Sequence, residues 1–218
     1  KIIADSYTYL LEASNLNILA LDAEAVAVSR ALITNSKDYT GMARALVDIG
    51  ASRSYIVIYD NDSIVFSKTL GFTGESVTTA IAQALKIERD LAEKIKTSTG
   101  INVDKDYPNY ITVIDTLIMK LVTEIKSSIR FYEEHFAAAN PITHITMCGG
   151  LSNLANIDTV LSQKLKISSR PGNVWKNLAP ASVSEGITDD EKRHGLAFAT
   201  AIGLALRAVD NPLVNSNL

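Results

Sequence analysis

The sequence contains few of the residues that form disulfide bonds or bind zinc in small proteins. Among its 218 residues are one cysteine, Cys148, and three histidines. A single cysteine excludes an intramolecular disulfide framework, and with so few histidines it leaves no cluster of zinc ligands. No stretch approaches the roughly eighteen uninterrupted apolar residues of a membrane span, and the amino terminus lacks a signal-peptide pattern. We therefore expect no direct membrane insertion and a reducing, cytoplasmic setting.

The charge balance is also close to neutral. The formal net charge is -3 and the isoelectric point is about 5.6, so there is no electrostatic footprint for nucleic acid and little attraction to an acidic membrane surface. Hydrophobic residues make up 47% of the chain and charged residues 21%, which is typical of a globular core. The chain begins at Lys1 rather than Met, which favours a piece of a longer protein.

Apolar spacing predicts an α/β protein with a mixed sheet covered by helices. Asp22 and Ser152 are expected to cap helices. We interpret the long apolar stripe after Tyr110 as one helix crossing the sheet rather than as a dimerising coiled coil. The helices at the two ends carry apolar faces that need cover, from each other or from a second copy. The expected helices cover 5–15, 22–35, 76–85, 110–139 and 194–209, with another carrying Leu154 to Leu165; the expected strands cover 18–21, 45–49, 55–59, 64–70 and 142–147.

Three connecting segments are also assigned. Asp60 to Ser63 is rich in residues that close hairpins. The polar segment 86–109, which contains Gly100 and Pro108, is expected to be a small insertion rather than core. Arg170 to Asn173 is expected to be a loop.

Two glycine turns about a hundred residues apart carry the main chemical signal. The first is Asp48-Ile49-Gly50-Ala51-Ser52 and the second is Cys148-Gly149-Gly150-Leu151-Ser152. A carboxylate followed by a turn without side chains lets backbone N–H groups meet a phosphate while the acid holds Mg²⁺ through water. The pattern indicates a nucleotide site.

Three segments in order resemble the PilM family of type IV pilus assembly, within the actin, Hsp70 and FtsA superfamily of ATPases. They are Leu19-Ala20-Leu21-Asp22-Ala23-Glu24, Val47 to Ser52, and Phe198 to Arg207. The resemblance implies an actin-like ATPase (ribonuclease H-like) fold with a complete second lobe and remnants of a truncated first lobe. On that pattern 41–186 is the second lobe, and 1–40 and 187–218 are the remnants.

The resemblance implies roles for the first turn. Asp48, Gly50 and Ser52 correspond to the second phosphate loop, with Asp48 facing hydrated Mg²⁺ and the N–H groups facing the β- and γ-phosphates. The alternative is an ordinary turn at a strand end. The sequence departs from the family at Arg53 and Ser54, where Thr is often found, which puts a hydroxyl contact to phosphate in doubt.

The other implied contacts lie around the base and sugar. Gly74 is either a further turn around the nucleotide or simply the start of a helix. Glu93 and Lys96 resemble the acidic and basic pair that touches adenosine, although a solvated charged helix has the same spacing. Gly149 and Gly150 match the adenosine turn, and a plain helix-entry turn is the alternative.

The remaining candidates have plainer interpretations. Glu24 stands where related ATPases place a carboxylate that orients the attacking water, and it could equally be a first-turn acid favoured by the helix dipole. Cys148 is expected to be a small buried hydrophobe. Trp175 is expected to pack a loop onto the lobe. The histidines His135, His144 and His194 are expected at the surface or at helix ends.

The function implied is a cytoplasmic, ATP- and Mg²⁺-binding scaffold of pilus assembly, peripheral to the inner membrane through a partner. That partner is the amino-terminal peptide of a PilN-like inner-membrane protein, with other pilus platform components beside it. The first phosphate loop is absent from this chain, so we expect this segment alone to bind ATP weakly and to be inactive as an enzyme. For the intact parent, the resemblance implies at most a weak ATPase. The alternatives are a cell-division or secretion-platform adaptor without nucleotide use, and a sugar-kinase-type enzyme.

Overall fold

The computed structural model describes residues 1–34, 39–101, 108–178 and 186–210. It contains one five-stranded sheet of order β3-β2-β1-β4-β5. β1 pairs antiparallel with β2 and parallel with β4, and β5 is parallel to β4. The mixed α/β class predicted from the sequence is confirmed. The strands are β1 (Ala43–Ile49), β2 (Ser54–Asp60), β3 (Ser63–Leu70), β4 (Ile142–Cys148) and β5 (Ser168–Pro171).

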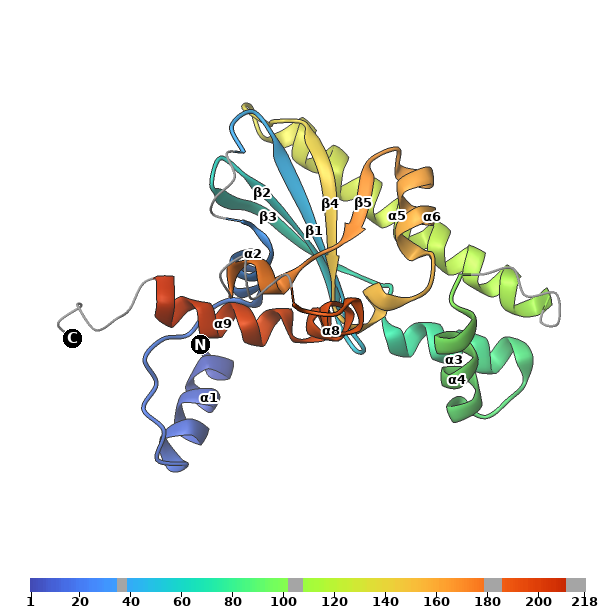
Figure 1. Ribbon diagram of the computed structural model, residues 1–218, viewed down its shortest axis with the longest axis horizontal. Helices are drawn as coiled ribbons and strands as arrows, with labels where there is room; N and C mark the ends of the chain where they lie inside the picture. Colours follow the sequence, from blue (N-terminus) through green and yellow to red (C-terminus); the bar gives the residue numbers. More distant parts are fainter. Residues whose placement is uncertain (35–38, 102–107, 179–185, 211–218) are drawn as a thin grey trace.

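Helices cover both faces of this sheet (Figure 1). The larger core lies on the side of α5, where Ile118, Leu121 and Ile125 are fully buried. The smaller core lies under α2 and α9 and includes Val28, Leu46 and Val57. The helices are α1 (Ile2–Ala13), α2 (Glu24–Leu32), α3 (Gly74–Leu85), α4 (Arg89–Thr99), α5 (Pro108–His135), α6 (Ile157–Leu165), α8 (Asp189–Gly195) and α9 (Ala199–Asp210), with short 3-10 turns η1 (Gly150–Asn153), η2 (Val174–Asn177) and η3 (Leu196–Phe198).

The long stripe forms one continuous helix, α5, packed along the sheet as expected. The β2–β3 hairpin is also as predicted. Asn61 and Asp62 take left-handed φ values of 47° and 55°, the conformation that a two-residue turn between right-twisted strands requires. Each helix that the structure describes is either too short or too polar to span a bilayer.

Several local predictions are wrong. Ile18–Leu21 forms no strand, and Leu19 is 70% exposed, because the described residues offer its backbone no neighbouring strand. Asp22 does not cap α2, whose N-cap is Ala23. The carboxylate of Asp22 instead forms ion pairs with the guanidinium groups of Arg30 and Arg207.

The carboxyl-terminal half differs in three further places. Ser152 does not cap α6, which begins at Ile157, because its hydroxyl donates to the carbonyl of Gly149. Residues predicted as a loop, Arg170 and Pro171, instead end strand β5. The segment 194–209, expected to be a single helix, is instead divided among the end of α8, the 3-10 turn η3 and α9.

The segment 86–109, predicted to be a small insertion, contains helix α4, and the prediction that this segment is not core is wrong. Ala92 and Ile95 of α4 are buried in the larger core. Residues 102–107 of that segment, Asn35 and residues 211–218 lie outside the described residues.

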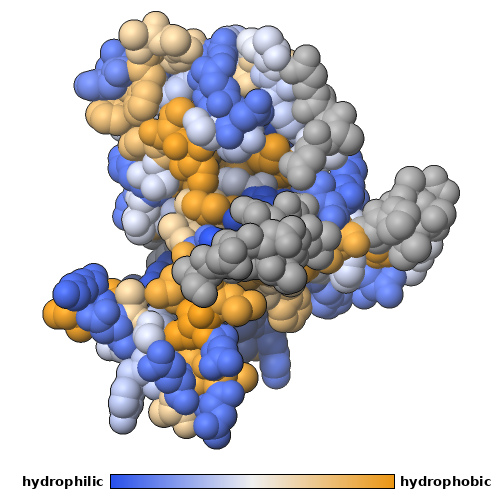
Figure 2. Space-filling view, turned by 90° about the vertical axis from the view of Figure 1, so that its left-hand side faces the viewer, coloured by the Kyte–Doolittle hydropathy of each residue, from blue (hydrophilic) through white to orange (hydrophobic). Residues whose placement is uncertain are grey.

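Helix α1 buries none of its residues, so α9 does not cover its apolar face. Ile2, Ile3 and Leu10 are exposed, and the lower half of Figure 2 shows apolar surface in this region. Trp175, in η2, donates from Nε1 to the carbonyl of Glu191 and packs against the smaller core, as expected.

Candidate nucleotide site

The first glycine turn joins β1 to β2. Ile49 pairs with Ser54, so residues 50–53 form the whole connection. The N–H of Gly50 donates to the carbonyl of Arg53 over 3.0 Å. A Cβ at position 50 would lie 2.5 Å from that oxygen, so the turn needs glycine there. Ser52 is exposed on this turn.

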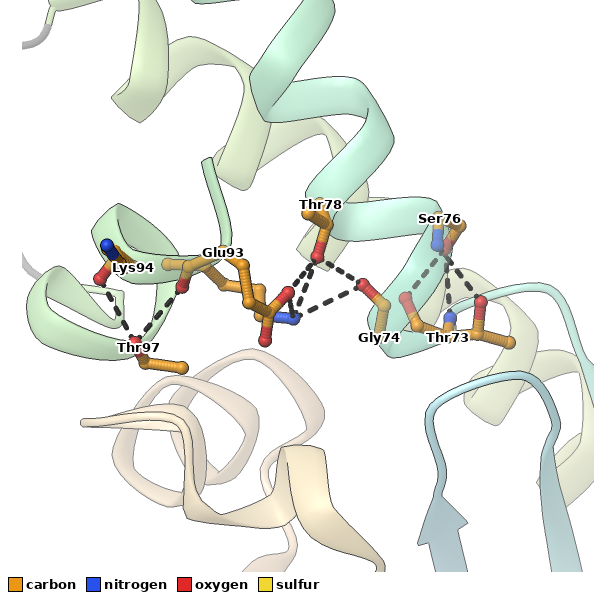
Figure 3. A network of polar contacts seen from close by, with 8 residues as sticks. Thr73, Gly74, Ser76, Thr78, Glu93, Lys94 and Thr97 are labelled. Atoms are coloured by element: carbon orange, nitrogen blue, oxygen red, sulfur yellow. Dashed lines mark hydrogen bonds and ion pairs between the residues drawn. The ribbon is translucent and has the colours of Figure 1, made fainter. Parts of the chain in front are cut away.

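The amino terminus of α3 sits directly on this turn. The N–H groups of Gly74 and Glu75 donate to the carbonyls of Gly50 and Ala51, over 3.0 and 2.8 Å. Gly74 is the first residue of α3, and the helix is capped by Thr73 (Figure 3). Gly74 therefore starts a helix, and its own amide is already bonded.

Glu93 and Lys96 join α4 to α3 through a polar network. Nζ of Lys96 donates to Oε2 of Glu93 over 2.6 Å and to Oγ1 of Thr78 over 2.9 Å. It also reaches the carbonyl of Gly74 at 3.3 Å. In Figure 3 the side chains of Thr78 and Glu93 point toward one another beside the carbonyl of Gly74. The family resemblance singled out Glu93 and Lys96, but sequence reasoning missed Thr78, whose position four residues after Gly74 puts both on one helical face.

The burial of Lys96 shows that this ion pair does not belong to a fully solvated charged helix. Lys96 is 4% exposed, whereas the Glu93 side chain is 50% exposed. Partial burial tends to raise the pKa of Glu93, but hydrogen bonds from Lys96 and Thr78 outweigh it and lower that pKa. The carboxylate thus stays charged, with one oxygen held and the other side open to solvent.

The second glycine turn packs against the first. Gly149 has φ +82°, and a Cβ there would overlap Oδ1 of Asp48. Its N–H donates to the carbonyl of Leu196 over 2.9 Å. Gly150 is different, because a Cβ there would meet nothing within 4 Å. Gly149 is required for packing, and Gly150 leaves open space beside the backbone.

Asp48 lies behind these turns and is 8% exposed. The hydroxyl of Tyr55 donates to Oδ2 over 3.1 Å. Burial raises the pKa of Asp48, and the negative charge of Glu24 adds to the rise, although hydrogen bonds from Tyr55 and the Cys148 thiol oppose it. Burial also raises the pKa of Cys148, so that thiol stays protonated and packs as the buried residue expected.

One cleft of about 490 Å³ is lined by several of the residues predicted to bind the nucleotide. This volume is within the range of small-molecule sites. Gly74, Glu93, Lys96 and Gly150 all line it, whereas Asp48, Gly50, Ser52 and Gly149 are not among its lining residues. Sequence reasoning missed several of the lining residues; the full set is Ala51, Gly74, Glu75, Thr78, Arg89, Asp90, Glu93, Lys96, Thr97, Gly150 and Leu151.

Glu24 stands apart from this cleft. It lines a second cavity, of about 310 Å³, together with Arg53 and Tyr55. The hydroxyl of Thr200 donates to Glu24 over 3.5 Å. Glu24 is still close enough to Asp48 to raise its pKa.

The chain's donors fit hydrated Mg²⁺ better than a protein-caged metal. In the part of the chain that the structure describes, no three His, Cys, Asp or Glu side chains converge on a metal position. Mg²⁺ is commonly held by one or two carboxylates, water and substrate phosphates. The Asp48 carboxylate is a ligand of that kind, and the negative charge of Glu24 is close enough to affect it. His135 and His194 are exposed and bond to helix carbonyls of their own.

Comparison with solved structures shows the same fold. A PilM–PilN type IV pilus biogenesis complex contains a chain that matches 91% of this one with a TM-score of 0.74 and 24% identity; this chain spans 55% of that chain's length. MreB5 of Spiroplasma citri bound to ADP matches all of the chain with a TM-score of 0.73 and 12% identity, over 68% of its own length. An archaeal actin homolog, Ta0583, matches 86% of the chain with a TM-score of 0.57 and 15% identity, over 54% of its own length. The fold is actin-like, as predicted.

The family described as type IV pilus assembly protein PilM matches residues 3–209, nearly the whole chain. This confirms the family that the three sequence segments indicated. The chain belongs to the PilM family of type IV pilus assembly proteins.

Proposed function

We propose that this chain binds ATP with Mg²⁺ in the cleft between the β1–β2 turn, α3, α4 and η1. The adenosine lies against Gly150, with Glu93 and Lys96 beside it, and the phosphates lie toward Gly50. The observation that carries the proposal is that one cleft is lined by Gly74, Glu93, Lys96 and Gly150, which span 77 positions of the sequence.

The proposed role of Asp48 is to hold hydrated Mg²⁺ from behind the phosphate turn. Its burial and the nearby charge of Glu24 support this, because both raise the pKa of Asp48 and a cation would favour the charged carboxylate that they disfavour. A bound divalent ion would supply charge neutralisation for the phosphates. Ser52, exposed on the same turn, is proposed to contact phosphate, and Glu24 to orient water in a parent that hydrolyses ATP.

We also propose the lobe division expected from the sequence. Residues 41–186 form the second lobe, and 1–40 with 187–218 are parts of the first. Two observations support it: the sheet and α3 to α6 share the larger core, and Gly203 of α9 packs against the backbone of Ala27 in α2.

At the level of the cell, we propose a scaffold of pilus assembly whose nucleotide state controls docking of a partner. The match to a PilM–PilN complex supports a PilN-like partner. That this partner is an inner-membrane protein that presents its amino-terminal peptide is what the family resemblance implies. The scaffold would then be cytoplasmic and held at the inner membrane through that partner. This chain presents one phosphate turn, so we expect its own ATP affinity to be weaker than micromolar.

Nuclear magnetic resonance titration with Mg·ATP tests the binding proposal, because it detects weak complexes. We expect shifts in the amides of Ala51, Gly74 and Gly150. Gly150→Leu should abolish them, since the added side chain enters open space in the cleft. Ser127→Leu, on the exposed face of α5, is the matched control for added bulk and should leave them unchanged.

Two results would replace the proposal. An unchanged spectrum and an unchanged melting temperature at millimolar Mg·ATP would favour an adaptor without nucleotide use, because a ligand that binds the native state must stabilise it. Phosphate release stimulated by a small sugar would favour a sugar kinase.

A further inference from the structure

The turn that forms the phosphate end of the proposed site has a cavity on each side. Ala51 lines the larger cleft, and Arg53, Ser54 and Tyr55 line the second cavity. The other walls of the second cavity come from the start of α2 and the edge strand β3: Glu24, Ala25, Ser67, Lys68 and Thr69. The two cavities are therefore neighbours across residues 50–53.

The side chain of Arg53 is uncommitted. Arg53 is exposed, and its guanidinium has no hydrogen-bond or ion-pair partner within residues 1–34, 39–101, 108–178 and 186–210. Its backbone is fixed, because its carbonyl accepts from Gly50. An arginine with free donors on a fixed stretch of backbone suits an oxyanion, since the planar guanidinium can bind two phosphate oxygens at once.

The second cavity also has the polar lining that a phosphate and its water need. Tyr55, Ser67 and Thr69 contribute hydroxyl-bearing residues, and Glu24 contributes a carboxylate. If Glu24 orients a water for attack, the terminal phosphate must lie in the cavity of Glu24 and not in the cleft of Glu93 and Lys96. A nucleotide that reaches both cavities has to cross the β1–β2 turn, because Ala51 of that turn lines one cavity and Arg53 lines the other.

We infer that Arg53 binds the terminal phosphate of a nucleoside triphosphate whose tail crosses this turn, and that it sets the preference for tri- over diphosphate. This inference rests on the proposed nucleotide site. It assigns a specific role to Arg53, which is one of the two positions, with Ser54, at which the sequence departs from the family pattern.

The test compares two ligands on three proteins. The Mg²⁺ complexes of ADP and of AMPPNP, which cannot be hydrolysed at the β–γ bridge, are titrated by nuclear magnetic resonance into wild type, Arg53→Gln and Arg130→Gln. Arg130 is exposed on α5 and lines neither cavity, so it is the matched control for loss of one surface cation.

We expect Arg53→Gln to weaken AMPPNP binding about tenfold, as for one charge-assisted hydrogen bond. ADP binding should change less than about twofold, since a general loss of charge is screened and small. Arg130→Gln should change neither. An equal loss for both ligands, or no loss for either, would overturn the role of Arg53 while leaving the nucleotide site standing. Failure of wild type to bind either ligand would overturn both.

Discussion

The hydroxyl of Tyr132 donates a 2.6 Å hydrogen bond to Oδ2 of Asp60. The same carboxylate accepts from Nδ2 of Asn140 over 2.8 Å and from its backbone N–H over 3.3 Å. Tyr132 and Asp60 are both buried. Asp60 therefore ties the end of β2 to the end of α5 and to the segment that leads into β4.

This arrangement predicts a pH-dependent part of the stability. Burial alone would raise the pKa of Asp60, but the hydrogen bonds from Tyr132 and Asn140 lower it. The ionised Asp60 should contribute fully to the free energy of unfolding above its unfolded-state pKa of about 4. This contribution should be lost as the pH falls through the lower pKa that Asp60 has in the folded protein. Tyr132→Phe should cost about 1 to 3 kcal/mol at pH 7 and less near pH 2, measured by urea unfolding.

The matched control is Tyr9→Phe, because Tyr9 is exposed on α1 and should show a change near zero at both values of pH. A cost for Tyr132→Phe that stays the same from pH 7 to pH 2 would show that Asp60 is not the acceptor that matters.

The hairpin and α5 were predictable because each depends on local chemistry. A left-handed Asn-Asp turn and a stripe repeating every three to four residues are written in consecutive residues. The strand predicted at Ile18–Leu21 is wrong because a strand needs a neighbouring strand to pair with, and no local sequence pattern supplies one. The helix cap predicted at Asp22 is wrong for a similar reason. Its carboxylate pairs with Arg30 and Arg207 instead, and Arg207 is far away in sequence.

The same distinction holds for the candidate site. Gly50 and Gly149 could be identified because a side chain at either position would collide with backbone or with Asp48. Lys96 was singled out by the family resemblance, but its burial comes from the packing of α4 on α3. That packing is why a segment of polar composition is part of the core, and why Thr78 became a partner.

A second prediction concerns the contact between α2 and α9. A Cβ on Gly203 would overlap the carbonyl oxygen of Ala27, and the carbonyl of Gly203 itself accepts from Arg30 over 2.8 Å. Alanine is the better helix former by about 1 kcal/mol, yet the overlap should dominate. We expect Gly203→Ala to lower the free energy of unfolding by roughly 2 kcal/mol, measured by chemical denaturation.

Gly150→Ala makes the same chemical change where a Cβ meets nothing within 4 Å. It should alter stability by no more than about 0.5 kcal/mol. Equal effects of the two substitutions would show that the close approach of α9 to α2 is not what requires glycine at position 203.

A third prediction concerns Thr78. Its Oγ1 accepts from Lys96 over 2.9 Å and lies 2.5 Å from Oε2 of Glu93. Thr78→Val should destabilise the protein by about 1 to 2 kcal/mol, because the buried ammonium loses an acceptor. The pKa of Glu93 should rise toward its ordinary value, since one of the hydrogen bonds that lower it is gone. Carboxyl-detected nuclear magnetic resonance titration measures the second effect.

Thr97→Val is the control for that substitution, because the hydroxyl of Thr97 donates only to exposed backbone carbonyls of its own helix. It should leave the pKa of Glu93 unchanged. If the two valine variants behave alike, the network between α3 and α4 does not hold Glu93.

The last prediction separates the effect of Asp48 on stability from its proposed role in binding Mg²⁺. Because burial raises its pKa, the charged carboxylate is less favourable in the folded chain than in the unfolded one. Its contribution to stability is therefore present below the unfolded pKa and is lost as the pH rises through the folded pKa. Asp48→Asn should raise the free energy of unfolding by roughly 1 kcal/mol at neutral pH and flatten the fall in stability above that pKa. Asp62→Asn, on the exposed hairpin turn, should do neither.

Thermal melting with millimolar Mg·ATP measures the Mg²⁺-binding role of Asp48 in the same variants. Wild type and Asp62→Asn should gain stability from the ligand, because a ligand that binds the native state stabilises it. Asp48→Asn should gain little, since the amide carries no charge to neutralise Mg²⁺. A less stable Asp48→Asn that still responds fully to Mg·ATP would mean that the carboxylate serves only to hold the two glycine turns together.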